Sequence, residues 1–257
     1  MDPLTPDQRP LPRISVVVPV KNEAGNILPL IEEIERACVP LSPFEVIYVD
    51  DGSTDPTLAE LGRARQMRPW LRVISHRESC GQSAAVRTGA QAARAPIVVT
   101  LDGDGQNDPA FIPDLVAALD IGGPDVALAA GQRVGRKDGE FKKLQSRIAN
   151  KVRGRILRDG TRDTGCGLKA FRREVYLALP YFDALHRFMP ALIRREGYAV
   201  VHVDVVDRPR RAGRSNYGMF DRLWVGIMDL AGVWWLIRRR RRVPQASEVL
   251  QVPEALR

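Results

Sequence analysis

Short apolar runs alternate with amphipathic stretches along the first hundred residues of the chain. The runs are rich in β-branched residues, have the length of buried strands and cover residues 14–20, 44–51, 71–76 and 96–102. The stretches between them carry apolar residues at helical spacing and cover residues 23–38, 55–67 and 81–95. This alternation predicts an α/β fold with a largely parallel sheet and right-handed crossovers.

The pattern becomes less regular after residue 109. A helix over 110–120 and a strand over 125–134 continue the alternation, and a helix with one apolar stripe is predicted over 139–157. The remaining predicted elements are, in chain order, a glycine-rich loop leading into a helix at 163–171, a helix from about 186, a strand over 199–207, a loop over 208–218 and an apolar helix over about 217–237.

The charge of the chain is unevenly distributed. Its 257 residues carry a formal charge of +8, and arginine is concentrated after residue 130, ending in the run 238–242. A basic C-terminal half indicates an anionic partner, which is a nucleic acid, a membrane surface or a phosphorylated substrate. The three cysteines contain no CxxC pair, so they favour a reducing compartment over a disulfide framework or a zinc site.

One segment, residues 223–237, is apolar enough to suggest contact with a membrane. It is only fifteen residues long and contains Asp229, so we do not expect it to span the bilayer. Trp224, Trp234 and Trp235 favour the interface between acyl chains and headgroups, and the arginines that follow are attracted to anionic lipids. We expect an amphipathic helix at an anionic membrane surface, with packing on the core or in an oligomer as the alternative.

Polar clusters follow three of the predicted strands, at 19–26, 50–55 and 102–108. Ligands of parallel sheets bind where the carboxyl ends of the strands meet. Asp102, Asp104 and Asp108 come directly after an apolar strand, and their mutual repulsion indicates a positive partner, first of all a metal ion. The glycine motifs of dinucleotide folds and P-loops, the motifs GxSxG and HExxH, and the spacing of an EF-hand loop are all absent.

The chain resembles glycosyltransferase family 2 in four segments that occur in the family's order: VVVPVKNEAGNI, VIYVDDGSTD, ESCGQSAAVRTG and VVTLDGDGQNDP. It is more similar to the polyprenyl-phosphate branch, the enzymes like dolichyl-phosphate mannose synthase, because of the later segments AGQRVGR, RDTGCGLKAFRRE, FMPALIRREGY and RPRRAGRSNYG. The resemblance covers residues 13–241 and implies a GT-A type nucleotide-sugar-binding fold. The expected division of the chain is a disordered tail at 1–12, the GT-A domain at 13–216, an interfacial helix with a polybasic end at 217–242 and a disordered tail at 243–257.

The resemblance also assigns residues to the nucleoside. The expected contacts are Asp51, with the base or ribose, and the segment that contains Pro19, Lys21 and Glu23. A turn and helix cap is the alternative role for Asp50 and Asp51, although Asp55 is equally well placed to cap the next helix.

The metal and the diphosphate are assigned to the acidic segment. Asp102, Gly103 and Asp104 resemble the DxD motif that binds the nucleotide-sugar, and Asp104 with Gln106 would hold Mg²⁺ or Mn²⁺. Arg133 matches an arginine that reaches the phosphates, which makes Asp102, Asp104 and Arg133 the expected catalytic residues. The expected ligands of the acceptor phosphate are Arg147, Arg208 and Arg214.

The implied reaction is an inverting, metal-dependent transfer of a sugar to a polyprenyl or dolichyl phosphate at the inner face of the cytoplasmic membrane. The donor is GDP-mannose or a UDP-sugar, and the family branch favours GDP-mannose. A family 2 enzyme with a soluble or polysaccharide acceptor is the alternative, and it would not need the apolar C-terminal helix. A nucleic-acid-binding protein would explain the arginines but not the acidic clusters, so no nucleic acid is expected as a partner, and a homo-oligomer stays open.

Overall fold

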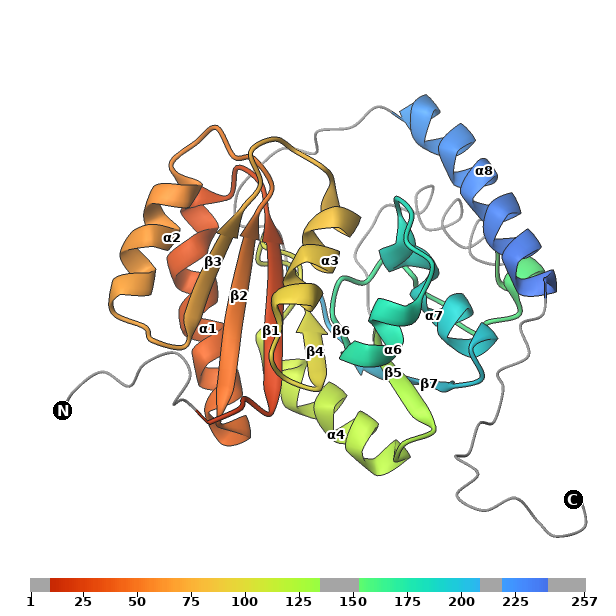
Figure 1. The fold of residues 1–257 in the computed structure, drawn as a ribbon, viewed down its shortest axis with the longest axis horizontal. Coiled ribbons are helices and arrows are strands. Elements are labelled where there is room, and N and C mark those ends of the chain that lie inside the picture. Colours follow the sequence, from red (N-terminus) through yellow and green to blue (C-terminus); the bar gives the residue numbers. More distant parts are fainter. Residues whose placement is uncertain (1–9, 135–152, 209–218, 240–257) are drawn as a thin grey trace, which may run out of the picture.

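The computed structural model describes residues 10–134, 153–208 and 219–239, which form one seven-stranded sheet with helices on both faces (Figure 1). The strand order is β3-β2-β1-β4-β6-β5-β7. Most neighbouring strands are parallel, and only β6 runs against its two neighbours. The predicted α/β fold with a mostly parallel sheet is confirmed.

The N-terminal half of the sheet follows the predicted alternation. Its parallel strands are β1 (Ile14–Val20), β2 (Phe44–Asp50), β3 (Leu71–Ser75) and β4 (Ile97–Thr100). The helices that connect them are α1 (Ile27–Cys38), α2 (Thr57–Gln66) and α3 (Gln82–Ala92). The continuous apolar runs form strands here because both faces of the sheet are covered, and every residue of β4 is buried.

The C-terminal half is built from shorter and more varied elements. They are α4 (Ile112–Gly122), β5 (Val126–Arg133), β6 (Lys169–Arg172), α6 (Arg173–Ala178), α7 (Leu185–Arg195), β7 (Ala199–Val205) and α8 (Met219–Arg238). The strands predicted at 125–134 and 199–207 and the helix predicted from 186 are confirmed. Most of the helix predicted over 139–157, and both predicted tails apart from residues 10–12, lie outside the described residues.

The prediction for 163–171, a loop leading into a helix, was wrong in one respect: the segment leads into the strand β6. β6 lies antiparallel between β4 and β5, with Lys169 opposite Thr100 and Phe171 opposite Leu128. The four residues KAFR are too few and too charged to show a strand pattern, so their conformation is set by the two neighbours that complete their backbone hydrogen bonds. Because β6 runs against β4, its first residue lies at the edge where β4 ends.

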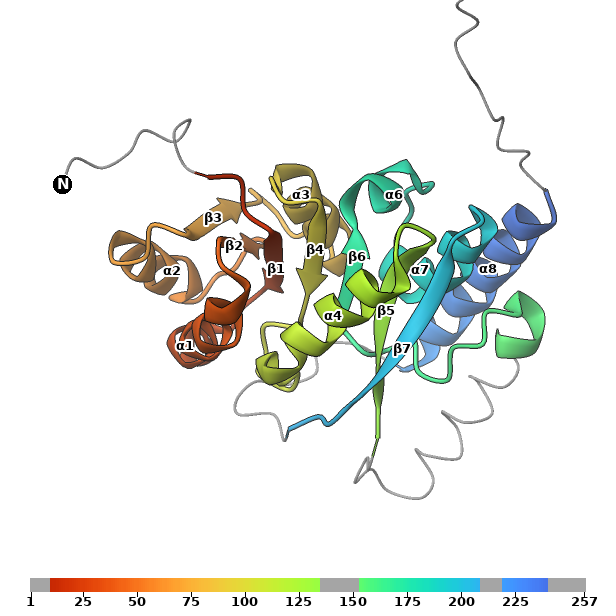
Figure 2. The same cartoon turned by 90° about the horizontal axis from the view of Figure 1, so that it is seen from below.

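The core has two parts, one on each face of the sheet. Helices α1, α2 and α4 cover one face, and α3, α6, α7 and α8 cover the other, as the turned view shows (Figure 2). Successive residues of β1 alternate between the two parts: Val16 and Val18 pack with the first and Val17 with the second. Gly89 allows α3 to approach β1 closely, since a Cβ there would lie 2.3 Å from Cγ1 of Val17.

The last helix, α8, packs on the rest of the molecule along part of its surface. Val233 is 1% exposed, and Leu230, Leu236 and Ile237 pack on the same side of the core as α7. Arg195 of α7 donates a hydrogen bond from Nε to the carbonyl oxygen of Leu236 at 3.0 Å. In the described part of the chain, no helix combines the length and the apolar character that crossing a bilayer requires.

A buried carboxylate stabilises the amino ends of the parallel strands. Glu45 is 0% exposed and accepts hydrogen bonds from Oγ of Ser15 at 2.7 Å, from Nη1 of Arg72 at 2.9 Å and from the backbone N–H and Nε of Arg94 at 2.7 and 3.0 Å. Burial by itself raises the pKa of Glu45, but the hydrogen bonds outweigh it, so the pKa lies below its usual value.

Replacement of Glu45 tests this arrangement. We expect Glu45→Gln to lower the free energy of unfolding by about 3 kcal/mol at pH 7, because two arginines lose their buried anion. Since the pKa of Glu45 is lower in the folded than in the unfolded chain, its contribution is present above the unfolded pKa and is lost as the pH falls through the folded pKa. Urea unfolding at several pH values should show the difference from wild type shrinking below about pH 4.

The matched control is Glu32→Gln, which changes an exposed glutamate of α1. We expect it to leave the free energy of unfolding within about 0.5 kcal/mol of the wild type. Equal stability of the two variants at pH 7 would contradict the role given to Glu45.

Candidate active site

The carboxyl ends of β1, β2 and β4 carry the three polar clusters, and these clusters touch one another. The backbone N–H of Asn22 donates to Oγ of Ser53 at 2.9 Å, and that of Thr54 donates to Oδ1 of Asn22 at 2.8 Å. The loop after β4 approaches the end of β1 so closely that a Cβ on Gly103 would lie 2.4 Å from Cγ1 of Val20. The clusters therefore form one continuous surface at this edge of the sheet.

The acid loop, residues 102–108, is held in shape by its own side chains. Oδ1 of Asn107 accepts a hydrogen bond from the backbone N–H of Asp102 at 3.0 Å. Oδ1 of Asp104 accepts one from the backbone N–H of Gln106 at 3.0 Å. These two bonds fix the backbone that carries both aspartates of the DxD motif.

The negative charge of Asp102 is unfavourable in its buried position beside Asp104. Burial and then the neighbouring charge of Asp104 raise the pKa of Asp102 to about 6, while the positive charges of Lys169 and Arg133 act in the opposite direction. Gln82 donates a hydrogen bond from Nε2 to Oδ1 of Asp102 at 2.7 Å. A divalent cation beside the two carboxylates would relieve their repulsion.

The side chains of the acid loop fit a hard divalent cation. Mg²⁺ and Mn²⁺ prefer oxygen ligands, and Asp104 and Gln106 offer a carboxylate and an amide oxygen two residues apart on one turn. Asp104 is almost buried at 9% exposure, a position in which a cation would offset the unfavourable desolvation of its charge. The assignment of these two residues as metal ligands stays a prediction.

Asp51 is bound by the loop that leads into α3. Its carboxylate is 5% exposed and accepts hydrogen bonds from the backbone N–H groups of Cys80 at 2.8 Å and Gly81 at 2.9 Å, from Oγ of Ser79 at 2.8 Å and from Nδ1 of His76 at 2.7 Å. Burial raises the pKa of Asp51, but these hydrogen bonds outweigh it and the pKa lies below its usual value. Asp51 thus stabilises a turn, as its alternative role requires, and its contact with a base or ribose stays a prediction.

Asp51, His76 and Cys80 also form a group of possible metal ligands, with ligand atoms within 4.8 Å of one another. The sequence did not predict this group, because His76 and Cys80 follow a different strand from Asp51. Nε2 of His76 lies 2.9 Å from Oγ1 of Thr88, and the oxygens of Asp51 accept the bonds described above. The group therefore acts as a hydrogen-bonded link between β2, β3 and α3.

The segment after β1 lies against the start of α2. The backbone N–H of Glu23 donates to Oγ1 of Thr57 at 2.8 Å. Oδ1 of Asp55 accepts a hydrogen bond from the backbone N–H of Thr57, the first residue of this helix, at 3.0 Å. Lys21 is exposed, and Pro19 lines a hollow beside the acid loop. The predicted contacts of Pro19, Lys21 and Glu23 with a nucleoside are untested.

Arg133, predicted to reach the phosphates, is held by two carboxylates. Its Nε and Nη2 donate to the two oxygens of Asp163 at 2.6 and 2.8 Å, and its Nη1 donates to Asp207 at 3.2 Å. Asp207 also accepts a hydrogen bond from Nδ2 of Asn107 in the acid loop at 3.4 Å. Arg133 is therefore connected to the acid loop through Asp207. A diphosphate that binds Arg133 would have to share the guanidinium with Asp163 and Asp207.

Arg208, predicted to bind the acceptor phosphate, also lies at the acid loop. Its backbone N–H donates to the carbonyl oxygen of Gln106 at 2.9 Å, and its guanidinium forms ion pairs with Asp108 and, at 2.7 Å, with Glu33. The other two predicted acceptor ligands, Arg147 and Arg214, lie outside the described residues.

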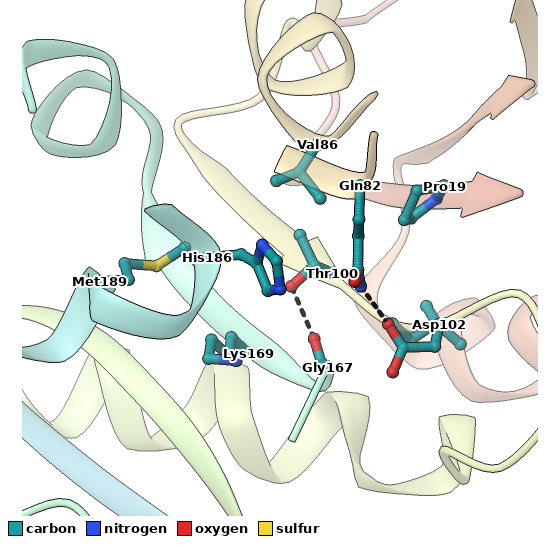
Figure 3. A pocket seen from close by; sticks show the side chains of 10 residues that line it. Pro19, Gln82, Val86, Thr100, Asp102, Gly167, Lys169, His186 and Met189 are labelled. Carbon is teal, nitrogen blue, oxygen red and sulfur yellow. Dashed lines mark hydrogen bonds between the residues drawn. The ribbon is translucent and has the colours of Figure 1, made fainter. Parts of the chain in front are cut away.

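A narrow hollow that opens to solvent adjoins the acid loop (Figure 3). Its lining residues come from β1, α3, the end of β4, the start of β6 and α7, and are Pro19, Gln82, Val86, Thr100, Leu101, Asp102, Gly167, Lys169, His186 and Met189. Nδ1 of His186 lies 2.7 Å from Oγ of Ser83. Burial, more than the charges of Lys169 and Arg187, lowers the pKa of His186 to about 3, so its imidazole is neutral at pH 7.

Comparisons with known proteins agree with this arrangement. The sequence matches the family Glycosyl transferase family 2 over residues 15–179. It is 35% identical over 237 residues to the dodecaprenyl-phosphate galacturonate synthase of Rhizobium johnstonii, covering 89% of this chain and 68% of the relative. It is 33% identical over 213 residues to an undecaprenyl-phosphate 4-deoxy-4-formamido-L-arabinose transferase of Serratia proteamaculans, covering 82% of this chain and 64% of the relative. The chain thus spans about two thirds of the length of these relatives.

Two solved structures share the fold. One is glucosyl-3-phosphoglycerate synthase from Mycobacterium tuberculosis in complex with UDP, with 22% identity, a TM-score of 0.64, and coverage of 90% of this chain and 82% of that one. The other is a mannosyltransferase from Pyrobaculum calidifontis in complex with GDP-Man and Mn²⁺, with 24% identity, a TM-score of 0.65, and coverage of 91% and 66%.

The sheet and the acidic edge therefore define a glycosyltransferase with a GT-A type fold. Within that class, the chain belongs to glycosyl transferase family 2. The predictions of the family and of the fold are confirmed.

Gly167 offers a test of the geometry around Asp102. A Cβ at this position would lie 2.4 Å from the carboxylate atoms of Asp102. We expect Gly167→Ala to displace the carboxylate and to lower the rate of sugar transfer by a factor on the order of 10². The melting temperature should change little, because the neighbouring carboxylate can move away from the added methyl group.

The matched control is Gly62→Ala in α2, where an added Cβ would meet nothing within 4 Å. We expect full activity and a slightly higher melting temperature for this variant, because alanine is the better helix former. Full activity of Gly167→Ala would show that the position of Asp102 is not critical.

Proposed function

We propose that this chain transfers a sugar, with inversion at the anomeric carbon, from GDP-mannose or a UDP-sugar to a polyprenyl phosphate at the surface of a membrane. The observation that carries the proposal is the acid loop at the carboxyl edge of the sheet, bordered on one side by the predicted nucleoside contacts and on the other by the hollow. The names of the two relatives, each of which includes a polyprenyl phosphate, support the acceptor.

The residues of the edge have separate tasks in this proposal. The segment with Pro19, Lys21 and Glu23 contacts the nucleoside, together with the turn held by Asp51. Asp104 and Gln106 hold Mg²⁺ or Mn²⁺, which supplies positive charge to the diphosphate as it departs. Arg133 adds a guanidinium within the same hydrogen-bonded group.

The acceptor phosphate needs no general base from the protein. A lipid phosphate is already anionic at pH 7, so it has to be positioned against the sugar rather than deprotonated. His186, which lines the hollow, is neutral and bonded to Ser83. Arg208 lies at the acid loop beside Asp108, where its guanidinium can receive a phosphate by exchanging its carboxylate partners.

The exposed face of α8 supports a peripheral association with the inner face of the cytoplasmic membrane. Trp235 is 52% exposed, and Trp234, Ile227 and Met228 are exposed on the same helix, while its other face packs on α7. Arg238 stacks over Trp234 at 4.4 Å, and Arg239 over Trp235 at 5.2 Å. Exposed tryptophans beside arginines are typical of a helix that rests in the headgroup region.

The transfer reaction is tested with purified protein, a short-chain polyprenyl phosphate, and a panel of UDP- and GDP-sugars with Mg²⁺ or Mn²⁺. We expect a lipid-linked sugar phosphate from at least one donor, no product in EDTA, and a loss on the order of 10²–10³ in kcat for Asp104→Asn. The control is Asp120→Asn, remote from the edge, in an exposed ion pair with Arg13. Transfer that is undiminished in EDTA would contradict the proposed metal dependence. Transfer to water-soluble acceptors only would contradict the proposed lipid acceptor.

Membrane association is tested by flotation with vesicles. We expect the wild type to float with vesicles that contain anionic lipid and to release as salt is raised, because arginine near an anionic surface contributes about 1 kcal/mol per residue. The double variant Trp234→Ser, Trp235→Ser should float at least tenfold less. The matched control is Met67→Ser, Ile121→Ser, which removes exposed apolar side chains elsewhere. A wild type that stays with the soluble fraction at low salt, or forms oligomers that the tryptophan variant abolishes, would favour an interface between copies instead.

A further inference from the structure

Lys169 is a buried cation at the floor of the hollow. Its side chain is 3% exposed, and its Nζ donates a hydrogen bond to the carbonyl oxygen of Cys166. Within the described ranges, Lys169 takes part in no ion pair. A buried ammonium group that bonds only to a carbonyl is unusual, because burial of a charge is unfavourable unless an anion compensates it.

The position of Lys169 is set by the sheet. It lies opposite Thr100 in the antiparallel pair of β6 and β4, two residues before the chain reaches Asp102. Asp102, Lys169 and His186 line the same hollow, and Figure 3 shows Lys169 and His186 on the side away from Pro19. The nucleoside is assigned to the Pro19 side and the diphosphate to Asp104, so the hollow is the place left for the sugar of the donor.

The lining of the hollow offers Lys169 a single carboxylate, that of Asp102. Among the described residues Asp102 forms no ion pair with Lys169, and its Oδ1 accepts a hydrogen bond from Gln82. Burial lowers the pKa of Lys169, and the attraction of Cys166 and Asp102 opposes that change only in part. His186 adds no charge, because its imidazole is neutral at pH 7. An incoming anion would therefore meet one cation and no other positive group of the lining.

We infer that the hollow selects a donor whose sugar carries a carboxylate, a uronic acid, and that Lys169 is the residue that determines this specificity. The inference rests on the proposed function, since it names the class of sugar that the same site transfers. A carboxylate would give Nζ a charge-assisted hydrogen bond in a setting of low dielectric constant. A neutral hydroxymethyl group at the same place would leave the ammonium group uncompensated.

The test compares pairs of donors that differ only at the sixth carbon of the sugar. Isothermal titration calorimetry with Mn²⁺ is run for UDP-glucuronate against UDP-glucose and for GDP-mannuronate against GDP-mannose, with UDP and GDP as references. We expect the wild type to bind the uronate at least tenfold more tightly than its neutral partner in the series whose base it accepts. Lys169→Met, which keeps the length of the side chain and removes its charge, should bring that ratio close to one and leave the Kd of the nucleoside diphosphate within twofold.

The matched control is Arg63→Met, which removes an exposed cation of α2 far from the hollow, and it should keep the wild-type ratio. Equal affinity of the wild type for both members of each pair would overturn the inference while leaving the proposed function intact. The inference would also be overturned if Lys169→Met lowered the affinity for the nucleoside diphosphate as much as the affinity for the uronate, because Lys169 would then bind the diphosphate. Failure of every nucleotide to bind the wild type would overturn both proposals. The comparison of wild-type affinities needs no variant, so it decides the question even if Lys169→Met does not fold.

Discussion

The antiparallel pairing of β6 with β4 is the constraint on which the site depends. β4 alone would place Asp102 at the carboxyl edge of the sheet, where the loops that follow parallel strands lie. β6 adds a second chain at that edge, which runs in the opposite direction and brings Gly167 against the carboxylate of Asp102 and Lys169 opposite Thr100. One strand thus provides both the steric limit on the acid and a buried positive charge that lines the same hollow.

The same edge gathers acids and bases into one connected group. Asn107 links the two sides: its Oδ1 accepts from the backbone of Asp102, and its Nδ2 donates to Asp207, which in turn bonds Arg133. Arg133 is further held by Asp163. Carboxylates that would repel one another in isolation are therefore kept in place by amide and guanidinium groups from distant parts of the chain.

The sequence was sufficient for those parts of the fold whose pattern is local. The strands of the N-terminal half show their burial as continuous apolar runs, and the acid loop is visible because three aspartates at 102–108 are conspicuous after such a run. β6 was not predictable in this way, because its identity as a strand comes from its neighbours. Lys169 and His186 were not predicted as site residues for the same reason, because their local sequence does not indicate that β6 and α7 place them in one hollow. Asp207, which follows β7, was likewise visible only as one acid among many.

The two ends of the proposed donor site come from different halves of the sheet, since β1 and β2 lie on one side of β4 and β6 on the other (Figure 1). The predicted nucleoside contacts all precede residue 110, on loops braced by Asn22 and Asp51. The floor of the hollow follows residue 163 and lies on β6 and α7, and the acid loop joins the two. The predicted nucleoside contacts and the floor of the hollow thus lie on different elements, although both are supported by one sheet and one shared core. A scaffold divided in this way allows descendants of one ancestor to keep their nucleotide while exchanging the sugar that it carries.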